Sequence, residues 1–191
     1  MTHVCAIVFL RLLAPMALAL AAILPLTGGA EETAADPGPT VIVVRHAEKI
    51  DDSRDPALSE AGAERAEALA ETLEHAGLDA AYASQYQRTR LTAMPAARAA
   101  GLPVRVEPIE GDVDAWTQGF SAELARDHPG ETVLVVGHSN TVPPLVAALC
   151  GCQVEPLTDS DYDRIYIVNG ARSRTPDLIV ARYGKASGQS D

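Results

Sequence analysis

The stretch that decides the fold is Thr40-Val41-Ile42-Val43-Val44-Arg45, in which β-branched residues follow one another without a break. A continuous run of this kind is typical of a strand that is covered on both faces, because no polar residue alternates with the apolar ones. Glu131-Thr132-Val133-Leu134-Val135-Val136-Gly137 repeats the pattern later in the chain. The two runs predict buried strands of a mostly parallel sheet.

Around these two strands, segments with helical and strand-like patterns alternate. Helical spacing of apolar residues covers residues 59–76, 87–100, 114–127 and 142–149. Shorter strands are expected at residues 80–83, 104–106, 164–168 and 178–181. The alternation predicts a three-layer α/β/α domain with a mostly parallel central sheet.

Cap and breaker residues mark where several helices begin and end. Ser59 is expected to cap the first helix, and Gly77 to stop it. Pro95 is expected at the start of the second helix or at a kink, because an interior proline removes a helical hydrogen bond. Pro143 and Pro144 fit only the first turn of the last helix.

The composition fits one compact domain. The 191 residues are 47% hydrophobic and 21% charged, which allows a buried core and argues against wholesale disorder. Fifteen Lys and Arg residues against 26 Asp and Glu residues give a net charge of −11. Binding nucleic acid or an anionic membrane surface needs a basic face. The charge balance therefore argues against both as partners.

The N-terminus differs from the rest of the chain. Residues 12–26 carry no charge, follow Arg11, and precede small residues that end at Ala30. This pattern is typical of a secretory signal peptide, because a membrane helix needs roughly 20 apolar residues. We expect cleavage after Ala30, export to the periplasm or cell exterior, and no stable membrane insertion afterwards. An uncleaved N-terminal membrane anchor is the alternative.

These boundaries divide the chain into four parts. They are a signal peptide over residues 1–30, a polar spacer over 31–39, the α/β domain over 40–184 and a tail over 185–191. Cys150 and Cys152 lie in the domain with one glycine between them. A disulfide across one residue is strained, and the gap is too short for a pair of zinc ligands. We therefore expect two free, partly buried thiols.

Conspicuous residues follow both buried strands. Arg45-His46-Ala47-Glu48 ends the first, and Gly137-His138-Ser139-Asn140-Thr141 ends the second. Ligands of such sheets bind beyond the carboxyl ends of the strands, so two histidines and an arginine are expected to converge there. A zinc deaminase would need a Cys-x-x-Cys motif, and a serine hydrolase elbow would need glycine in place of Thr141. Phosphoryl transfer through a histidine is the third chemistry that such a set of residues could serve.

Four segments resemble motifs of the histidine phosphatase (phosphoglycerate mutase-like) superfamily, and they occur in the same order along the chain as in that family. Arg45-His46-Ala47-Glu48 resembles its RHG/RHA signature, and Gly137-His138-Ser139 is similar to its second-histidine motif. Residues 58–66 are similar to its L-S/T-x-x-G-x-x-x-A segment, and residues 84–93 to its S-x-x-x-R-x-x-x-T-A segment. The resemblance implies the fold of that family and a phosphohistidine intermediate.

The residues themselves fit that chemistry. A phosphomonoester is nearly dianionic at neutral pH, and Arg45 and Arg88 offer permanently charged, bidentate donors to it. Neighbouring arginines disfavour the charged form of His46, which therefore keeps the lone pair of a nucleophile. His138 is expected to donate to a phosphoryl oxygen. Lys49 and Ser139 are expected to bind substrate, and no metal or other cofactor is expected.

The general acid is expected between the second arginine motif and the strand that precedes His138. Glu107 adjoins a strand and Asp114 is expected to cap the next helix, which leaves Glu110 as the preferred acid and Asp112 as the second choice. Other polar residues near the motifs are interpreted as packing, capping, loop or solvated residues: Ser84 and Thr92, Asn140, Glu48 and Arg90.

The sequence thus predicts an exported phosphomonoesterase that acts on a small phosphate ester or a phosphorylated surface sugar. A phosphohistidine-protein phosphatase or a mutase with the same site is the alternative within the family. A non-catalytic phosphate-binding protein is the alternative of another class. No motif predicts the oligomeric state.

Overall fold

A computed structural model describes residues 38–187, so the predicted signal peptide and most of the spacer lie outside the described residues. The elements follow in the order β1 (Thr40–Arg45), α1 (Glu60–Thr72), β2 (Ala80–Ala83), α2 (Gln87–Ala99), β3 (Val104–Val106), α3 (Val113–Asp127), β4 (Thr132–Gly137), α4 (Val142–Cys150), β5 (Arg164–Asn169) and β6 (Asp177–Arg182). Between Gly38 and Ser187, no helix has both the length and the apolar content needed to cross a membrane.

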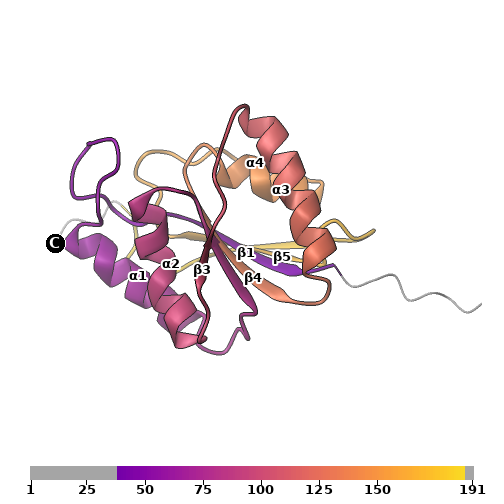
Figure 1. Cartoon of the computed structure of the whole chain (residues 1–191), viewed down its shortest axis with the longest axis horizontal. Coiled ribbons are helices and arrows are strands. Elements are labelled where there is room, and N and C mark those ends of the chain that lie inside the picture. The colour runs from indigo at the N-terminus through magenta and orange to yellow at the C-terminus, as the bar shows by residue number, and fades with distance from the viewer. Residues whose placement is uncertain (1–37, 188–191) are drawn as a thin grey trace, which may run out of the picture. The chain divides into compact units, whose positions relative to one another are not determined.

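The six strands form one sheet in the order β3-β2-β4-β1-β5-β6. β1 and β4 are neighbours and run parallel, with Val43 opposite Val135. β2 pairs in parallel with both β4 and β3. On the other side of β1, β5 runs antiparallel to β1, and β6 runs antiparallel to β5. Helices α1 and α2 cover one face of the sheet, and α3 and α4 cover the other (Figure 1). The predicted α/β fold with a mostly parallel sheet is confirmed.

Each face of the sheet has its own hydrophobic core, which explains the unbroken apolar run of β1. Val41 and Val43 belong to the core that contains Phe120 of α3 and Leu145 of α4. Ile42 and Val44 belong to the core on the other face, with Leu69 of α1. Successive side chains of a strand point to opposite faces. A strand covered by helices on both sides therefore needs an apolar residue at every position.

The helix boundaries follow most of the predicted signals. Ser59 caps α1 through its hydroxyl oxygen, which accepts from the N–H of Gly62 at 3.1 Å. α1 nevertheless ends at Thr72, because the chain then forms a tight turn in which the N–H of Ala76 donates to Leu73. Pro143 and Pro144 lie in the first turn of α4 as predicted.

Two predictions about where helices begin need correction. Of the two places expected for Pro95, a helix start or a kink, the structure excludes the start, because Pro95 lies inside α2. Asp112, not Asp114, is the N-cap of α3, and its carboxylate accepts from the N–H of Ala115 at 2.9 Å. The helix therefore begins one residue earlier than its apolar spacing indicates. An N-cap side chain must reach back to the first turn, and Asp112 is the residue in place to do so.

The expectation of two free thiols is wrong, because Cys150 and Cys152 form a disulfide. Gly151 between them adopts a left-handed conformation, with φ 63° and ψ 26°. This conformation reverses the chain and brings the two Cα atoms to 5.2 Å, within the usual range for a disulfide. Spacing along the sequence alone did not reveal this reversal, which glycine adopts without a steric penalty.

The described part of the predicted tail contacts the domain. The Ser187 hydroxyl accepts from the N–H groups of Tyr162 and Asp163 at 2.9 and 3.0 Å, and the N–H of Ser187 donates to the Asp163 carboxylate.

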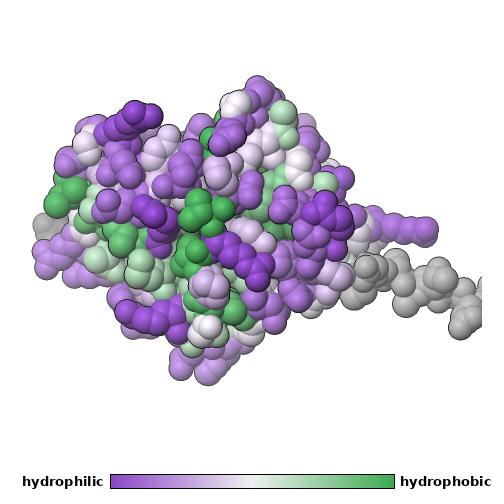
Figure 2. Space-filling model, in the orientation of Figure 1, coloured by the Kyte–Doolittle hydropathy of each residue, from purple (hydrophilic) through white to green (hydrophobic). Residues whose placement is uncertain are grey.

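The surface facing the viewer in Figure 2 is mostly hydrophilic, with hydrophobic residues gathered in a strip near β3. Val106 of β3 is 47% exposed.

Candidate active site

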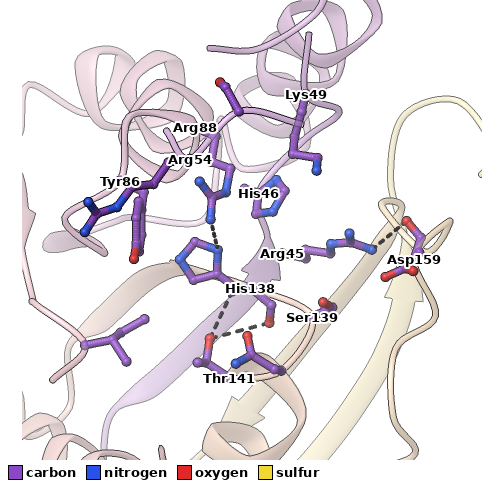
Figure 3. Close-up of a pocket in the computed structure, with 13 residues that line it drawn as sticks. Arg45, His46, Lys49, Arg54, Tyr86, Arg88, His138, Ser139, Thr141 and Asp159 are labelled. Atoms are coloured by element: carbon purple, nitrogen blue, oxygen red, sulfur yellow. Dashed lines mark hydrogen bonds between the residues drawn. The ribbon is translucent and has the colours of Figure 1, made fainter. Parts of the chain in front are cut away.

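The carboxyl ends of β1 and β4 lead into one cavity of about 400 Å³. Because these strands are parallel neighbours, the residues that follow them meet at the same edge of the sheet. Figure 3 shows the side chains of His46, Arg88 and His138 facing a common space. The full lining consists of Arg45, His46, Lys49, Ser53, Arg54, Tyr86, Arg88, Ile109, His138, Ser139, Asn140, Thr141 and Asp159.

His46 is buried, with 4% of its surface exposed, and its tautomer follows from its contacts. Its Nδ1 lies 2.8 Å from the carbonyl oxygen of Ala47, which can only accept, so Nδ1 carries the hydrogen. Nε2 therefore holds the lone pair. Burial lowers the pKa of His46 to about 4, and the charges of Arg45 and Arg88 act in the same direction. The imidazole is neutral at physiological pH and suited to nucleophilic attack.

Arg45 is held from one side by the loop that precedes β5. Its Nη1 donates to the carbonyl oxygens of Thr158 and Asp159 at 2.8 and 3.0 Å, and its guanidinium lies 4.1 Å from the ring centroid of Tyr162. Its Nε is buried and has no hydrogen-bond partner in the structure. Buried donors are nearly always paired, so this N–H is available for an anion in the cavity.

Arg88 of α2 completes the cationic wall. Its guanidinium lies 4.5 Å from the ring centroid of Tyr86, and its Nη2 donates to Nδ1 of His138 at 3.3 Å. Like that of Arg45, its Nε is buried without a hydrogen-bond partner. Two guanidinium groups with unpaired donors thus border the same cavity. Such a pair matches a phosphoryl group, which offers several acceptor oxygens.

His138 has a defined tautomer that involves two residues interpreted from the sequence as structural. Because Arg88 can only donate, Nδ1 of His138 accepts and Nε2 carries the hydrogen. Nε2 donates to the Ser84 hydroxyl at 2.8 Å, and this hydroxyl lies 2.9 Å from that of Thr89. Burial, Arg88 and then His46 lower the pKa of His138 to about 3. Ser84 therefore orients the second histidine as well as forming a turn.

The loop after His46 is tied to both helices of its layer. The Thr92 hydroxyl accepts from the N–H of Ala47 at 2.9 Å, so Thr92 supports the site in addition to packing. Glu48 forms an ion pair with Arg65 of α1 at 2.7 Å rather than pointing into the cavity. Gly62 lets α1 approach this loop, because a Cβ there would lie 2.2 Å from the carbonyl oxygen of Glu48.

The structure brings most of the predicted site residues together, with one exception. Arg45, His46, Lys49, Arg88, His138 and Ser139 all line the cavity. Glu110 is exposed and is absent from the lining, although its neighbour Ile109 belongs to it. Asp112, the second choice for the general acid, is occupied as a helix cap. In residues 38–187 no cluster of three or more His, Cys, Asp or Glu side chains is arranged to hold a metal ion.

The sequence reasoning missed several lining residues, among them Arg54, Tyr86 and Asp159. Tyr86 lies within the segment that resembles a family motif, and its position two residues before Arg88 could have indicated its stacking. Arg54 and Asp159 lie in loops without a periodic pattern. Only the fold brings these loops to the cavity, so no local signal could have found them.

Several acidic residues lie between the Arg88 motif and the strand that precedes His138. Among them, Glu107 has a distinctive environment. It lines a narrow hollow beside the main cavity, and Ile109 and Thr141 line both. Burial raises the pKa of Glu107, and the nearby charge of Glu123 raises it further. A carboxyl group that holds its proton at higher pH is a better proton donor under physiological conditions.

Comparisons with known proteins agree with this geometry. Residues 41–118 match the model of the histidine phosphatase superfamily (branch 1). Phosphoserine phosphatase 1 of Hydrogenobacter thermophilus is 37% identical over 98 residues, which cover 47% of this chain and 46% of that protein. The chain thus matches about half the length of this curated relative.

Solved structures share the fold at low sequence identity. Mycobacterial glucosyl-3-phosphoglycerate phosphatase superposes with a TM-score of 0.62 at 19% identity, over 76% of this chain and 99% of that one. The protein histidine phosphatase SixA complexed with tungstate gives 0.58 at 22% identity, over 75% of this chain and 96% of the other. With the two histidines at adjacent strand ends, these likenesses lead to one conclusion: residues 41–118 resemble the histidine phosphatase superfamily in sequence, and the domain shares the fold of the two phosphatases above.

Proposed function

We propose that this protein is a phosphoric monoester hydrolase that transfers the phosphoryl group to His46 and then to water. One observation carries the proposal. Two neutral imidazoles, with ring centroids 5.3 Å apart, lie beside two guanidinium groups whose buried Nε–H donors have no partner. This arrangement supplies a nucleophile, a second hydrogen-bonding ring and the charge that a phosphoryl group needs.

The first step follows from the tautomer of His46. The phosphoryl oxygens bind Arg45 and Arg88, and Nε2 of His46 attacks phosphorus. The nitrogen–phosphorus bond forms while the bond to the ester oxygen breaks, and the leaving oxygen takes a proton from the general acid. Water then attacks the phosphohistidine, which releases inorganic phosphate and restores the imidazole.

His138 changes its hydrogen bonding when a phosphoryl group is bound. In the structure its Nδ1 accepts from Arg88, and burial together with nearby positive charge keeps its pKa low. A dianion beside the ring favours the protonated form and raises the pKa. A protonated His138 donates from Nδ1 to a phosphoryl oxygen while Nε2 keeps its hydrogen bond to Ser84. Charge that develops during transfer is then stabilised by this donor.

We assign the general acid to Glu107 in place of the sequence-based choice, Glu110. Three observations support this change: Glu107 is partly buried, its pKa is raised, and it lines a hollow adjoining the cavity. Glu110 is exposed and lines neither the cavity nor the adjoining hollow.

Trapping of the phosphoenzyme tests the proposal and separates it from a phosphate-binding protein without turnover. Acid-labile label from a phosphate ester should appear on wild type and vanish in His46→Ala. His128→Ala is the matched control, because His128 is equally buried but lies outside the cavity. Hydrolysis of p-nitrophenyl phosphate with EDTA present should accompany the label. A protein that binds phosphate without hydrolysing p-nitrophenyl phosphate would contradict the proposal.

Export and substrate class complete the proposal. The uncharged run before Ala30 supports a cleaved signal peptide, and hence a small phosphate ester or phosphorylated sugar met outside the cytoplasm. Phosphoserine joins the substrates to test because the curated relative is a phosphoserine phosphatase. The intact mass of protein secreted by a Gram-negative host should correspond to residues 31–191. A mature form that retains Arg11 would show that the segment is not removed.

A further inference from the structure

We propose that the Cys150–Cys152 disulfide is a thiol–disulfide exchange site that reacts with small anionic thiols of the glutathione class. The disulfide lies at the C-terminal end of α4, whereas the proposed phosphatase site lies beyond the other end of that helix. Cys150 is 8% exposed, whereas Cys152 is exposed. An attacking thiolate can therefore reach one sulfur of the bridge, and the other remains shielded.

The disulfide contributes little to holding the fold together. It closes a loop of only three residues, and the stabilisation from a disulfide falls as its loop shortens. Backbone hydrogen bonds already secure this end of α4: the N–H of Gly151 donates to Ala147 at 2.9 Å, and that of Arg172 donates to Leu149 at 2.8 Å. Because the helix end is held without the bridge, the chain can tolerate its reduction.

A cationic hollow adjoins the disulfide on the side of Cys150, and Cys152 lies just outside its lining. Its volume is about 340 Å³, and Cys150, Arg172 and Arg174 contribute to its lining. Arg172 has φ 59° and is, within residues 38–187, the one non-glycine residue in the left-handed region. Unfavourable backbone of this kind persists where the surroundings hold it, and it often occurs at functional sites. Here it brings an arginine to the end of α4 in a protein whose net charge is −11.

The reaction balances with a thiol as reductant. A thiolate attacks Sγ of Cys152, the disulfide bond breaks, and Sγ of Cys150 receives the electron pair and then a proton from water. The product is a mixed disulfide on Cys152. A second thiol attacks this mixed disulfide, which releases the Cys152 thiol and the oxidised reductant. Two electrons pass to the protein, and the arginines favour a reductant that carries carboxylates.

The test measures how fast two thiols reduce the folded, oxidised full-length chain. Reduced glutathione is the anionic probe and dithiothreitol the neutral one, and alkylation followed by peptide mass spectrometry reads Cys150 and Cys152. Both thiols should open the bridge in the folded protein. Arg174→Ala should lower the ratio of the glutathione rate to the dithiothreitol rate severalfold, and added salt should do the same in wild type.

Arg98→Ala is the matched control, because Arg98 is an exposed arginine on α2 outside this hollow. It should keep the wild-type ratio. The proposal is wrong if the bridge resists both thiols until the protein unfolds. It is also wrong if Arg174→Ala and Arg98→Ala give the same ratio. Neither outcome bears on the phosphatase proposal, because the readout involves no phosphate ester.

Discussion

Buried histidines occupy two regions of this molecule and have opposite surroundings. His46 and His138 lie at the strand ends among arginines, and their pKa values are lowered to about 4 and about 3. His128 lies after α3, where its Nδ1 is 2.6 Å from the Glu131 carboxylate and its Nε2 is 2.9 Å from the Tyr82 hydroxyl. All three are at most 8% exposed.

The difference shows that burial by itself does not make a histidine reactive. Both ring nitrogens of His128 have partners within the protein, so neither is available to a ligand. His46 has one nitrogen bonded to the Ala47 carbonyl, which leaves Nε2 free toward the cavity. Burial and nearby cations lower the pKa of His46 and keep that nitrogen unprotonated. A free lone pair in a cationic cavity is thus the feature that distinguishes the proposed nucleophile.

Next to loss of the nucleophile His46, the largest effect on turnover is expected for Glu107, which lines the hollow between the two regions together with Tyr82 and Ser84. Glu107→Gln should reduce kcat roughly 10²–10⁴-fold on an alkyl phosphate, because the alkoxide leaves only with a proton. The loss on p-nitrophenyl phosphate should be far smaller, because nitrophenolate leaves unprotonated. Steady-state kinetics on both substrates checks this. Glu110→Gln is the matched control, and a selective loss there instead would restore the sequence-based choice.

Replacing one arginine in each region by alanine tests whether the two histidine regions differ in function. Arg88→Ala should weaken phosphate binding and transition-state stabilisation together, by about 2–4 kcal/mol for a desolvated charge contact. Arg105→Ala removes the arginine that donates to Tyr82 beside His128, and it should leave kcat/KM close to the wild-type value. Kinetics and calorimetric titration with inorganic phosphate measure both. Equal losses in the two variants would mean that the cationic cavity has no special role.

A smaller effect is expected in the pH dependence of stability. His46 and His138 bind protons more weakly in the folded than in the unfolded state, where a histidine pKa is about 6.5. Their contribution to stability is therefore fully present above about pH 6.5 and is lost as pH falls through about 4 for His46 and about 3 for His138. The slope is about 1.4 kcal/mol per pH unit for each histidine.

Chemical unfolding across this pH range checks that slope. The His46→Asn/His138→Asn double variant should show a clearly shallower slope than wild type. Inorganic phosphate should also flatten the wild-type slope, because a bound anion offsets the cost of protonating the rings. A double variant with the wild-type slope would show that other groups control acid stability.

Most of the fold and the core of the site could be predicted from the sequence. The apolar runs ending at Arg45 and Gly137 located the two central strands, and residue order placed His46 and His138 at their ends. The general acid was harder to predict from the sequence, because Glu107 and Glu110 are near neighbours along the chain and differ in burial, which only the fold decides. Arg54 and Asp159 were missed because the loops that carry them have no pattern.

The sequence by itself determined the strands, the helices and which arginines and histidines follow the buried strands, because periodicity and residue type are local properties. Tertiary structure decided what those residues do. Ser84 and Thr92 became supports of the site through hydrogen bonds to His138 and to the N–H of Ala47. Gly151 turned the chain so that two cysteines became a disulfide. Burial and proximity across the fold set pKa values and hydrogen-bond partners, and neither can be read from neighbours along the chain.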